Sequence, residues 1–539
     1  MSEIHFSYYS ACWNLLLPAR PKNHFLAPMA GLPVLPSGDR APTSGVIDPA
    51  GPQNGAGRVG VCVRRWKLTS VESVTDTQIE ERFAPFRARM AGAPPIVINT
   101  FHHYYAELVR GSAGLIAEDQ IRPVESLPNA DDLEGFAAAG REALARTMIL
   151  KLNGGLGTSM GLDGAKSLLP VREGLSFLDI IARQVLSLRR KTGCRVPLLF
   201  MNSFSTDADT RAALARYPDL PSDTPLSFLQ NKIPKVLQKG LALPEPESEL
   251  TWTPPGHGDL YTALQTSGIL DTLLTNGYEY AFVSNSDNLG AVMDERISGY
   301  FAENRLPFLM EVADRTEADR KGGHLARRPD GRFLLREVAQ CPPDDLEAFQ
   351  DITRYRYFNT NSIWLNLPAL RDALYRSGGI LRLPLIRNSK TLDPRDPESP
   401  PVYQLETAMG AAIEVFEGAG AVRVPRDRFA PVKLCSDLLA LWSDAYELTD
   451  EGRVVLNRGT RGQPPVVTLD PRFYRLIDDL KARFPAGAPS LKVCETFKVT
   501  GDVRFGSGII VRGQTSVTNP SDRQVTIADG TILQGNVEL

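Results

Sequence analysis

The chain has 539 residues, which is too long for a single hydrophobic core and indicates two or three domains. Hydrophobic residues make up 42% and charged residues 23%, as in an ordinary globular protein. A net charge of −3 excludes the broad basic surface that binds nucleic acid or an anionic membrane. Any anionic ligand must therefore be held by local groups.

The six cysteines are scattered and form no Cys-x-x-Cys pair. This argues against a disulfide framework or a zinc site and favours the reducing cytoplasm. No apolar run approaches the ~20 residues that cross a bilayer, so we expect no membrane partner. The short apolar patch at residues 13–18 lacks a basic leader, and we interpret it as neither a signal nor an anchor.

Residues 1–75 differ from the rest of the chain. Proline and glycine are dense from Pro18 to Gly60, and no periodic apolar pattern persists for more than a few residues. We expect a flexible extension here. A wrongly assigned start codon would give the same pattern.

Residues 76–147 are predicted to form an N-terminal helical segment. Thr75 can cap a first helix, and a second and a third helix follow, the third beginning near Asp131 and Asp132. The apolar residues recur at helical spacing in all three: Ile79, Phe83, Phe86 and Met90, then Phe101, Tyr104, Tyr105, Leu108 and Val109, then Phe136, Ala139 and Leu144.

Residues 148–446 read as a catalytic α/β domain in which strands, loops and helices alternate. Apolar runs at 148–152, 196–201 and 280–283 each end in small polar residues, and an amphipathic helix spans 175–188. This pattern predicts a doubly wound, mixed but mostly parallel sheet of Rossmann-like type. In such sheets ligands bind beyond the carboxyl ends of the strands, where all three polar clusters fall.

Residues 447–539 are predicted to form a separate C-terminal domain. After about residue 490, valine and isoleucine recur at short spacing and glycines interrupt them, a pattern that no helix would tolerate. Short strands that turn every few residues indicate a small β-helix.

The strongest chemical signal is the segment Leu152-Asn153-Gly154-Gly155-Leu156-Gly157, which is followed by Lys166. A loop so rich in glycine lets backbone N–H groups approach phosphate oxygens, and a nearby lysine adds a positive charge. The loop fits neither a P-loop, because Ala165 precedes Lys166-Ser167, nor the dinucleotide fingerprint, because its glycines are spaced GxGxxxG. A glycine-rich surface turn is the alternative interpretation.

Two other segments carry weaker signals. Asn285-Ser286-Asp287 follows a buried strand, where the carboxylate of Asp287 is well placed to hold Mg²⁺ against a triphosphate; an Asx turn is an equally good interpretation. His257 lies in the rigid loop Pro254–Asp259 and could donate to a phosphate or a sugar hydroxyl, although a lone loop histidine is more often structural. Gln230, Asn361 and Lys433 carry little information in isolation.

Taken together, ordered blocks from about residue 80 to the end resemble the eukaryotic-type UTP–glucose-1-phosphate uridylyltransferases, also called UDP-glucose pyrophosphorylases. The blocks are LKLNGGLGTSMG with Lys166, FMNSFSTDADT, FLQNKIPKV, PPGHGDLY, FVSNSDNLG, KGGHL, FNTNSIWLNL, QLETAMGAAI and VPRDRFAPVK ending at Lys433. So many specific blocks in one order make chance similarity implausible.

The resemblance implies roles for individual residues. Those implied to contact the uridine nucleotide are Leu152, Asn153, Gly154, Gly155, Lys166, Gln230, Gly256, Asp287 and Lys433. Those implied to contact the sugar phosphate are Gly155, His257, Asn285, Ser286, Asp287 and Asn361. Lys166, Lys433 and Asp287 are the expected catalytic groups, and Asp287 the expected ligand of a Mg²⁺ cofactor. The resemblance also implies that the C-terminal β-helix is left-handed.

The chain departs from the family pattern at a few positions. The family's FNQ block reads Phe228-Leu229-Gln230, Ser286 replaces an isoleucine, and the second asparagine pair reads Asn361-Ser362. These changes keep the contacting residues. Residues 393–401 look like a small surface insertion, and the first 75 residues match nothing recognised.

The implied reaction is attack by a phosphate oxygen of glucose 1-phosphate on the α-phosphorus of UTP, which gives UDP-glucose and pyrophosphate. Such chemistry needs positioning and charge neutralisation rather than a protein nucleophile. Three matters stay open. The sugar could be N-acetylglucosamine or one of several hexoses; the chain could be a non-catalytic UDP-sugar-binding protein; and the open end of the β-helix could pair with another subunit or be covered in a monomer.

Overall fold

The computed structural model describes residues 74–111, 114–157, 160–162, 164–394, 396–460 and 462–539. All of them belong to one body of the chain. The expected extension over residues 1–75 falls outside this range, apart from Val74 and Thr75. Among the described residues, no helix is both long and apolar enough to cross a membrane. Cys194, Cys341, Cys435 and Cys494 are free thiols.

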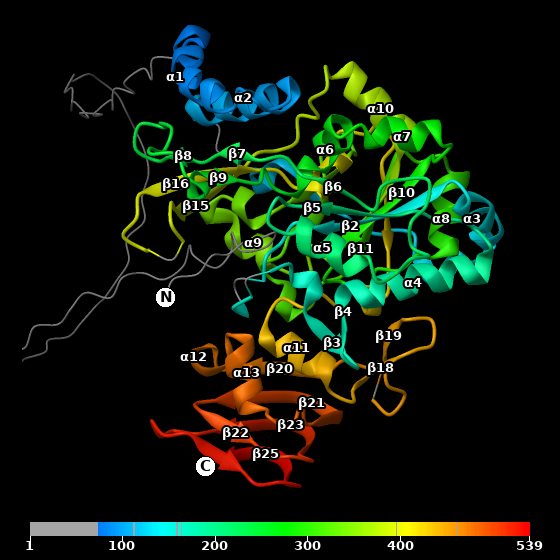
Figure 1. Ribbon diagram of the computed structural model, residues 1–539, viewed down its shortest axis with the longest axis vertical. Helices are drawn as coiled ribbons and strands as arrows, with labels where there is room; N and C mark the ends of the chain where they lie inside the picture. The colour runs from blue at the N-terminus through cyan, green and yellow to red at the C-terminus, as the bar shows by residue number, and fades with distance from the viewer. Residues whose placement is uncertain (1–73, 112–113, 158–159, 163, 395, 461) are drawn as a thin grey trace, which may run out of the picture. The chain divides into compact units, whose positions relative to one another are not determined.

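The first two predicted helices are confirmed as α1 (Asp76–Arg89) and α2 (Pro95–Val109). Thr75 Oγ1 accepts from the Gln78 N–H at 3.3 Å, and the Gln78 side chain accepts from the Thr75 N–H at 2.9 Å, so a capping box begins α1. The helices share an aromatic core and form the hairpin at the blue end of the chain in Figure 1.

The third helix, α3 (Ala137–Leu144), begins later than the expected start near Asp131 and Asp132. Two short 3₁₀ turns, Ala130–Asp132 and Glu134–Phe136, take up the preceding residues. Leu133, between the two turns, has φ −94° and ψ 17°, outside the α-helical region, so a regular helix begins only after it. Helix α3 packs against α8 (Glu295–Glu303) on the right of Figure 1.

The central sheet has its main strands in the order β1-β12-β14-β10-β2-β5-β6, and β11, β13 and β17 pair beside them. Their bounds are β1 (Arg122–Pro123), β2 (Thr147–Asn153), β5 (Leu198–Asn202), β6 (Ser227–Leu229), β10 (Tyr280–Asn285), β11 (Phe308–Asp314), β12 (His324–Arg327), β13 (Phe333–Arg336), β14 (Tyr357–Asn366) and β17 (Gly420–Arg423).

The sheet is mixed, as predicted, but it is less parallel than predicted. Strands β10, β2, β5 and β6 run parallel to one another, whereas β14 pairs antiparallel with β10 and with β12, and β1 pairs antiparallel with β12. The parallel strands are joined by helical crossovers, and β12 and β13 form an antiparallel pair that needs only a tight turn. The parallel half contains the glycine-rich segment.

Strand β2 is buried on both faces of the sheet, as expected for a central parallel strand. Ile149 packs into one core, while Met148 and Leu150 pack into another, because successive side chains point to opposite faces. The covering helices are α4 (Phe177–Thr192), α5 (Asp207–Leu214), α6 (Leu260–Thr266), α7 (Ile269–Thr275), α9 (Leu346–Gln350) and α10 (Leu367–Arg376).

Short strands form small sheets beside the central one. Strands β8, β15 and β16 form a sheet whose β8 and β16 residues share the core of α1 and α2. The bounds are β3 (Pro170–Arg172), β4 (Leu175–Ser176), β7 (Ile233–Pro234), β8 (Val236–Leu237), β9 (Trp252–Thr253), β15 (Ile386–Thr391) and β16 (Pro401–Glu406).

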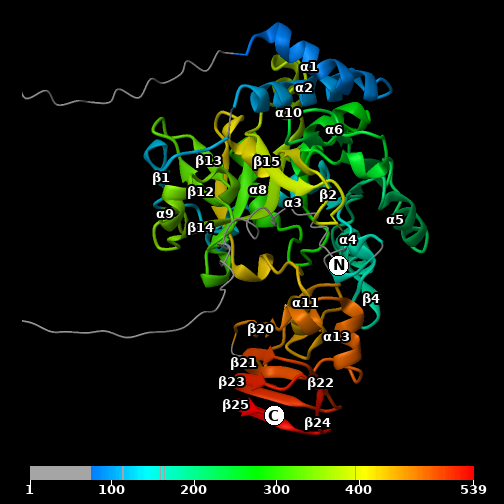
Figure 2. The same ribbon diagram turned by 90° about the vertical axis from the view of Figure 1, so that its left-hand side faces the viewer.

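The C-terminal region contains stacked parallel strands, which Figure 2 shows in orange and red. Leu469, Val499, Val517 and Val537 lie opposite one another on successive strands, so the recurring apolar residues form a column. The bounds are α11 (Cys435–Trp442), β18 (Tyr446–Leu448), β19 (Val454–Leu456), β20 (Val466–Leu469), α12 (Pro471–Tyr474), α13 (Ile477–Arg483), β21 (Ser490–Thr500), β22 (Val503–Phe505), β23 (Ile510–Thr518), β24 (Val525–Ile527) and β25 (Ile532–Glu538).

Candidate functional site

The glycine-rich segment leaves the end of β2 and returns to it. Leu156 and Ala165 form an antiparallel bridge, and the Lys166 N–H donates to the Gly155 carbonyl at 3.3 Å. The excursion therefore brings Lys166 back beside the first glycines, although eleven positions separate it from Gly155 in the chain. Lys166 and the first glycines of the loop therefore form one structural unit.

Lys166 and Asp287 form an ion pair across the edge of the sheet. Lys166 Nζ lies 2.7 Å from Asp287 Oδ2, and the two side chains are 17% and 21% exposed. The pair forms because β10 runs parallel to β2 with Asn285 opposite Leu152, so both strands end together. The Ser286 N–H then donates to the Leu152 carbonyl at 3.0 Å and continues the pairing past the strand end.

Asn153 fastens the ends of three neighbouring strands. Its Nδ2 donates to Asn202 Oδ1 at 2.8 Å and to Thr210 Oγ1 at 2.9 Å, and its Oδ1 accepts from Ser286 Oγ at 3.2 Å. The side chain is buried and fully engaged in these bonds. Only the backbone of Leu152 and Asn153 is left to meet a ligand.

The Gln230 side chain packs against Gly154 of the glycine-rich loop. A Cβ atom on Gly154 would come within 2.7 Å of Gln230 Nε2, so the loop and the Gln230 side chain pack closely. Gln230 is buried, and neither Nε2 nor Oε1 has a hydrogen-bond partner among the described residues. An unpaired buried amide is costly, and this one presents a donor and an acceptor beside the loop.

Lys433 joins this group from a distant part of the chain. The Val432 N–H donates to the Asp287 carbonyl at 3.3 Å, which holds the two segments together. Burial lowers the pKa of the Lys433 ammonium, and the nearby carboxylate of Asp287 opposes that shift. Lys166 also acts on Lys433 electrostatically, so two lysines and one aspartate share the site.

His257 is a buried, neutral histidine with a defined tautomer. Gly256, at φ +80°, turns the loop so that the Thr407 backbone passes where a side chain would lie. His257 Nδ1 accepts from the Met409 N–H at 3.1 Å, so the ring proton resides on Nε2, which is a donor. Burial lowers the pKa of the His257 imidazole to about 3.

Asn361 occupies a bulge of β14. The register against β11 shifts between Glu311 and Val312, and Asn361 adopts a positive φ of 56°. The Asn359 side chain supports this conformation, because its Oδ1 accepts from the Asn361 N–H at 2.9 Å and its Nδ2 donates to Asn361 Oδ1 at 2.9 Å. Bulges and positive-φ residues are typical of sites where a side chain is re-aimed.

The predicted residues fall into two groups. One contains the glycine-rich loop, Lys166, Gln230, residues 285–287 and Lys433. The other contains His257 and Asn361, which are linked indirectly through the segment Met409–Glu414. His257 binds Met409, and the next residue, Gly410, packs on the Asn359 side chain that supports Asn361.

Two residues that the sequence reasoning missed connect these groups to their surroundings. Glu337 follows β13, packs on Gly323 and interacts electrostatically with Lys433; burial raises the pKa of its carboxyl to about 7. The Asn359 N–H in turn donates to the Gly323 carbonyl at 3.3 Å, so Glu337 bridges the groups. Asn288, next to Asp287, is buried and bonded on both sides. A polar residue directly after a strand was the signal that could have revealed Glu337.

Asp287 is the candidate metal ligand. The part of the chain that the structure describes holds no cluster of three or more acidic, histidine or cysteine ligands. Mg²⁺ is commonly held by one or two carboxylates together with substrate phosphates and water. The lone carboxylate of Asp287, which already accepts the ammonium of Lys166, fits that mode and does not fit an all-protein metal cage.

The chain was compared with protein families and with characterised relatives. A family model described as UTP–glucose-1-phosphate uridylyltransferase matches residues 98–512. The enzyme of that name from Hordeum vulgare is 41% identical over 423 residues, which cover 77% of this chain and 86% of the relative. The Saccharomyces cerevisiae enzyme is 38% identical over 460 residues, or 84% and 89% of the two chains.

Solved structures give the same result. A mutant of the UDP-glucose pyrophosphorylase of Leishmania major, in complex with UDP-glucose, superposes with a TM-score of 0.80 at 43% identity and covers 85% of this chain and 99% of its own. A structure titled UDP-glucose phosphorylase from Trypanosoma brucei gives a TM-score of 0.79 at 44% identity, with 86% and 99% covered.

Proposed function

The chain belongs to the UTP–glucose-1-phosphate uridylyltransferase family and makes UDP-glucose from UTP and glucose 1-phosphate, and we propose that Lys166, Asp287 and Lys433 carry this reaction. The observation that carries the assignment is the Lys166–Asp287 ion pair beside the glycine-rich loop. Lys433 is close enough to interact electrostatically with both groups. Three charged groups from distant parts of the sequence converge where phosphates would lie.

The reaction is an in-line displacement at the α-phosphorus of UTP. An ionised oxygen of glucose 1-phosphate forms the new P–O bond, and the bond to the β-phosphate oxygen breaks and releases pyrophosphate. Because the attacking oxygen is already an anion, the chain supplies no base. Its work is to align the two anions and to offset their repulsion with the ammonium groups of Lys166 and Lys433.

Asp287 would hold Mg²⁺ together with phosphate oxygens. The bound ion would neutralise charge on the triphosphate. Lys166, which pairs with Asp287 in this structure, would then turn toward the phosphates of UTP. Backbone N–H groups of Gly154 and Gly155 would meet the same phosphates, because no side chain stands in the way.

Gln230 would select uridine. Its amide offers one donor and one acceptor, the complement of the uracil edge, which carries a carbonyl and a ring N–H. Both atoms lack a partner among the described residues, and they lie against Gly154 of the glycine-rich loop. Binding of the base would satisfy an amide that otherwise costs free energy. Leu152, Asn153 and Gly256 would contribute backbone contacts to the same nucleotide.

His257, Asn285, Ser286 and Asn361 would hold the sugar phosphate, with Gly155 beside them. His257 is suited to donate from Nε2, since Met409 fixes its tautomer. Asn285 is partly exposed at the end of β10, whereas Ser286 is buried and reaches the sugar through its backbone. Glu337 would accept from a sugar hydroxyl, because its buried carboxyl interacts electrostatically with Lys433.

Substrate choice is tested by assay of the purified chain with UTP, Mg²⁺ and a panel of sugar 1-phosphates. Pyrophosphate release should be far faster with glucose 1-phosphate than with N-acetylglucosamine 1-phosphate, whose N-acetyl group needs space beside Asn361. Equal rates, or the reverse order, would contradict the glucose assignment. A chain that binds UDP-glucose but releases no pyrophosphate would contradict the roles of the lysines.

The C-terminal strands would form the coils of a left-handed β-helix. The column from Leu469 to Val537 supports this, since stacked coils place equivalent residues one above the other. Strand β25 is the last of its sheet, and its free edge is suited to pair with a second copy of the chain. The free thiols of the described cysteines agree with a cytoplasmic location.

A further inference from the structure

Asn288 joins two segments that are far apart in the chain. Its Nδ2 donates to the Arg428 carbonyl at 3.0 Å, and its Oδ1 accepts from the Ala430 N–H at 3.1 Å. The same oxygen accepts from the Gly290 N–H at 3.2 Å, so the side chain is engaged on both segments. Asn288 is 1% exposed and therefore does not touch substrate.

The two joined segments carry the proposed catalytic groups. Asp287 immediately precedes Asn288, and Lys433 is the last residue of the segment 428–433, the strap. Asn288 and Pro431 form an antiparallel bridge, and the Val432 N–H donates to the Asp287 carbonyl at 3.3 Å. The backbones pack closely, since a Cβ atom on Gly290 would lie 2.2 Å from the Asp427 carbonyl oxygen.

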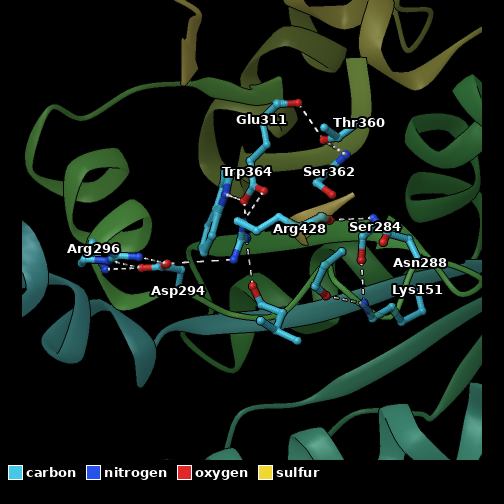
Figure 3. A network of polar contacts seen from close by, with 12 residues as sticks. Lys151, Ser284, Asn288, Asp294, Arg296, Glu311, Thr360, Ser362, Trp364 and Arg428 are labelled. Carbon is cyan, nitrogen blue, oxygen red and sulfur yellow. Dashed lines mark hydrogen bonds and ion pairs between the residues drawn. The ribbon is translucent and has the colours of Figure 1, made fainter. Parts of the chain in front are cut away.

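The start of the strap is itself fixed. The Arg428 guanidinium donates from Nε to Glu311 Oε2 at 2.9 Å and from Nη2 to Glu311 Oε1 at 2.7 Å. Trp364 Nε1 also donates to Glu311 Oε1, at 2.9 Å. Figure 3 shows Arg428 held at its guanidinium by Glu311 and at its backbone by Asn288. The strap thus begins at an anchor on β11.

We propose that Asn288 is a positioning residue, which sets the separation of Asp287 and Lys433 by clamping the strap 428–433 to the loop after β10. The inference rests on the proposed roles of those two groups. Asparagine suits the position, because the clamp needs a donor toward Arg428 and an acceptor toward Ala430 on one short side chain. Aspartate lacks the donor, and leucine lacks both.

The test is a double-mutant cycle in the full chain. Asn288→Ala should lower kcat on the order of 10- to 100-fold, since displacing a catalytic group by about 1 Å has that effect. In a Lys433→Ala background the same change should cost little, because there is no ammonium left to position. Asn288→Asp, which keeps the two acceptor bonds, should show the same pattern.

Asn519→Ala is the matched control. Asn519 is also buried and also fastens a turn. Its Nδ2 donates to the Asp502 and Arg523 carbonyls at 2.7 Å, and its Oδ1 accepts from the Ser521 N–H at 3.0 Å. It lies among the C-terminal strands, so its loss should lower the melting temperature while kcat is kept. Melting temperatures of all variants separate loss of fold from loss of positioning.

The outcomes are distinct. An equal loss of kcat from Asn288→Ala with and without Lys433 would overturn the inference, as would normal kcat in both Asn288 variants. Failure of both Asn288 variants to fold, while Asn519→Ala folds, would show a purely structural role and would also overturn it. Normal turnover of Lys433→Ala alone would instead refute the proposed function, and the inference would fall with it.

Discussion

Lys166 Nζ lies 2.7 Å from Asp287 Oδ2, so the lysine of the glycine-rich loop and the carboxylate after β10 neutralise each other before any nucleotide arrives. If Lys166 and Asp287 bind the phosphates and Mg²⁺ as proposed, binding of UTP must separate this pair. The positive charge can then face the phosphates, and the negative charge can face a metal ion. The pair keeps both groups in place at the edge of the sheet.

Replacement of Lys166 by alanine should lower kcat on the order of 100-fold or more, because one preorganised charge at the phosphates is lost. Steady-state pyrophosphate release measures the effect. Lys191→Ala is the matched control, since Lys191 Nζ forms an ion pair of 2.9 Å with Glu451 on the exposed end of α4. The control should turn over normally. Equal losses in both variants would show that the phosphates lie elsewhere.

Gln230→Leu should weaken UTP binding about 10-fold while leaving the melting temperature of the free protein unchanged or raised. The amide atoms of Gln230 have no partner among the described residues, so their removal costs no hydrogen bond in the free state. Titration calorimetry and thermal melting measure the two quantities.

Gln184→Leu provides the contrast. Gln184 Nε2 donates to the Leu289 and Gly452 carbonyls at 3.2 and 3.1 Å, so this variant should melt earlier and bind UTP normally. If Gln230→Leu melts as early as Gln184→Leu and binds UTP unchanged, the assignment of Gln230 to the base is wrong.

The buried His257 should make the protein sensitive to acid. Burial lowers the pKa of its imidazole from 6.5 to about 3. Between these values the unfolded chain takes up a proton that the folded chain does not, so the free energy of unfolding falls as the pH falls. His257→Gln has no such proton, and its stability should fall less from pH 7 to pH 4. Urea unfolding at stepped pH measures the difference; parallel curves would contradict a neutral buried His257.

Removal of residues 1–73 should leave activity intact. The family match begins at residue 98, and the capping box of Thr75 and Gln78 starts the first described helix. A second deletion that ends at Pro94 also removes α1, whose Phe83 and Phe86 pack on Phe101 and Tyr105. The longer deletion should lower the melting temperature. Loss of activity in the shorter one would give the N-terminal residues a role in the fold or in catalysis.

Deletion of residues 525–539 should change particle mass or melting temperature and leave UTP affinity intact. The deletion removes β24 and β25, which contain none of the proposed site residues. Light scattering coupled to size exclusion reports the mass. Lost UTP affinity at constant mass and constant melting temperature would contradict a role in self-association or end-capping.

Local sequence patterns predicted a helix or strand correctly where one clear signal was present, such as a capping residue or a continuous apolar run. The capping residue Thr75 marks the start of α1, and the amphipathic pattern over 175–188 marks α4. The continuous apolar run that becomes β2 is typical of a strand covered on both faces. The start of α3 was placed too early, and the sheet was expected to be more parallel than it is. The antiparallel half depends on which strands meet, and strand pairing between distant segments leaves little trace in local sequence.

The amino-acid sequence by itself determined the family, the glycine-rich loop, and the identities of the residues proposed to meet the substrates, because short blocks of unusual composition carry that information. Only the tertiary structure decided how those residues meet. The pairing of β10 with β2 brings Asp287 to Lys166, and a buried asparagine at position 288 holds the strap that ends in Lys433. Asn288 and Lys433 are 145 positions apart in the chain, and burial and hydrogen bonding between their segments place them together. No local sequence pattern encodes such contacts.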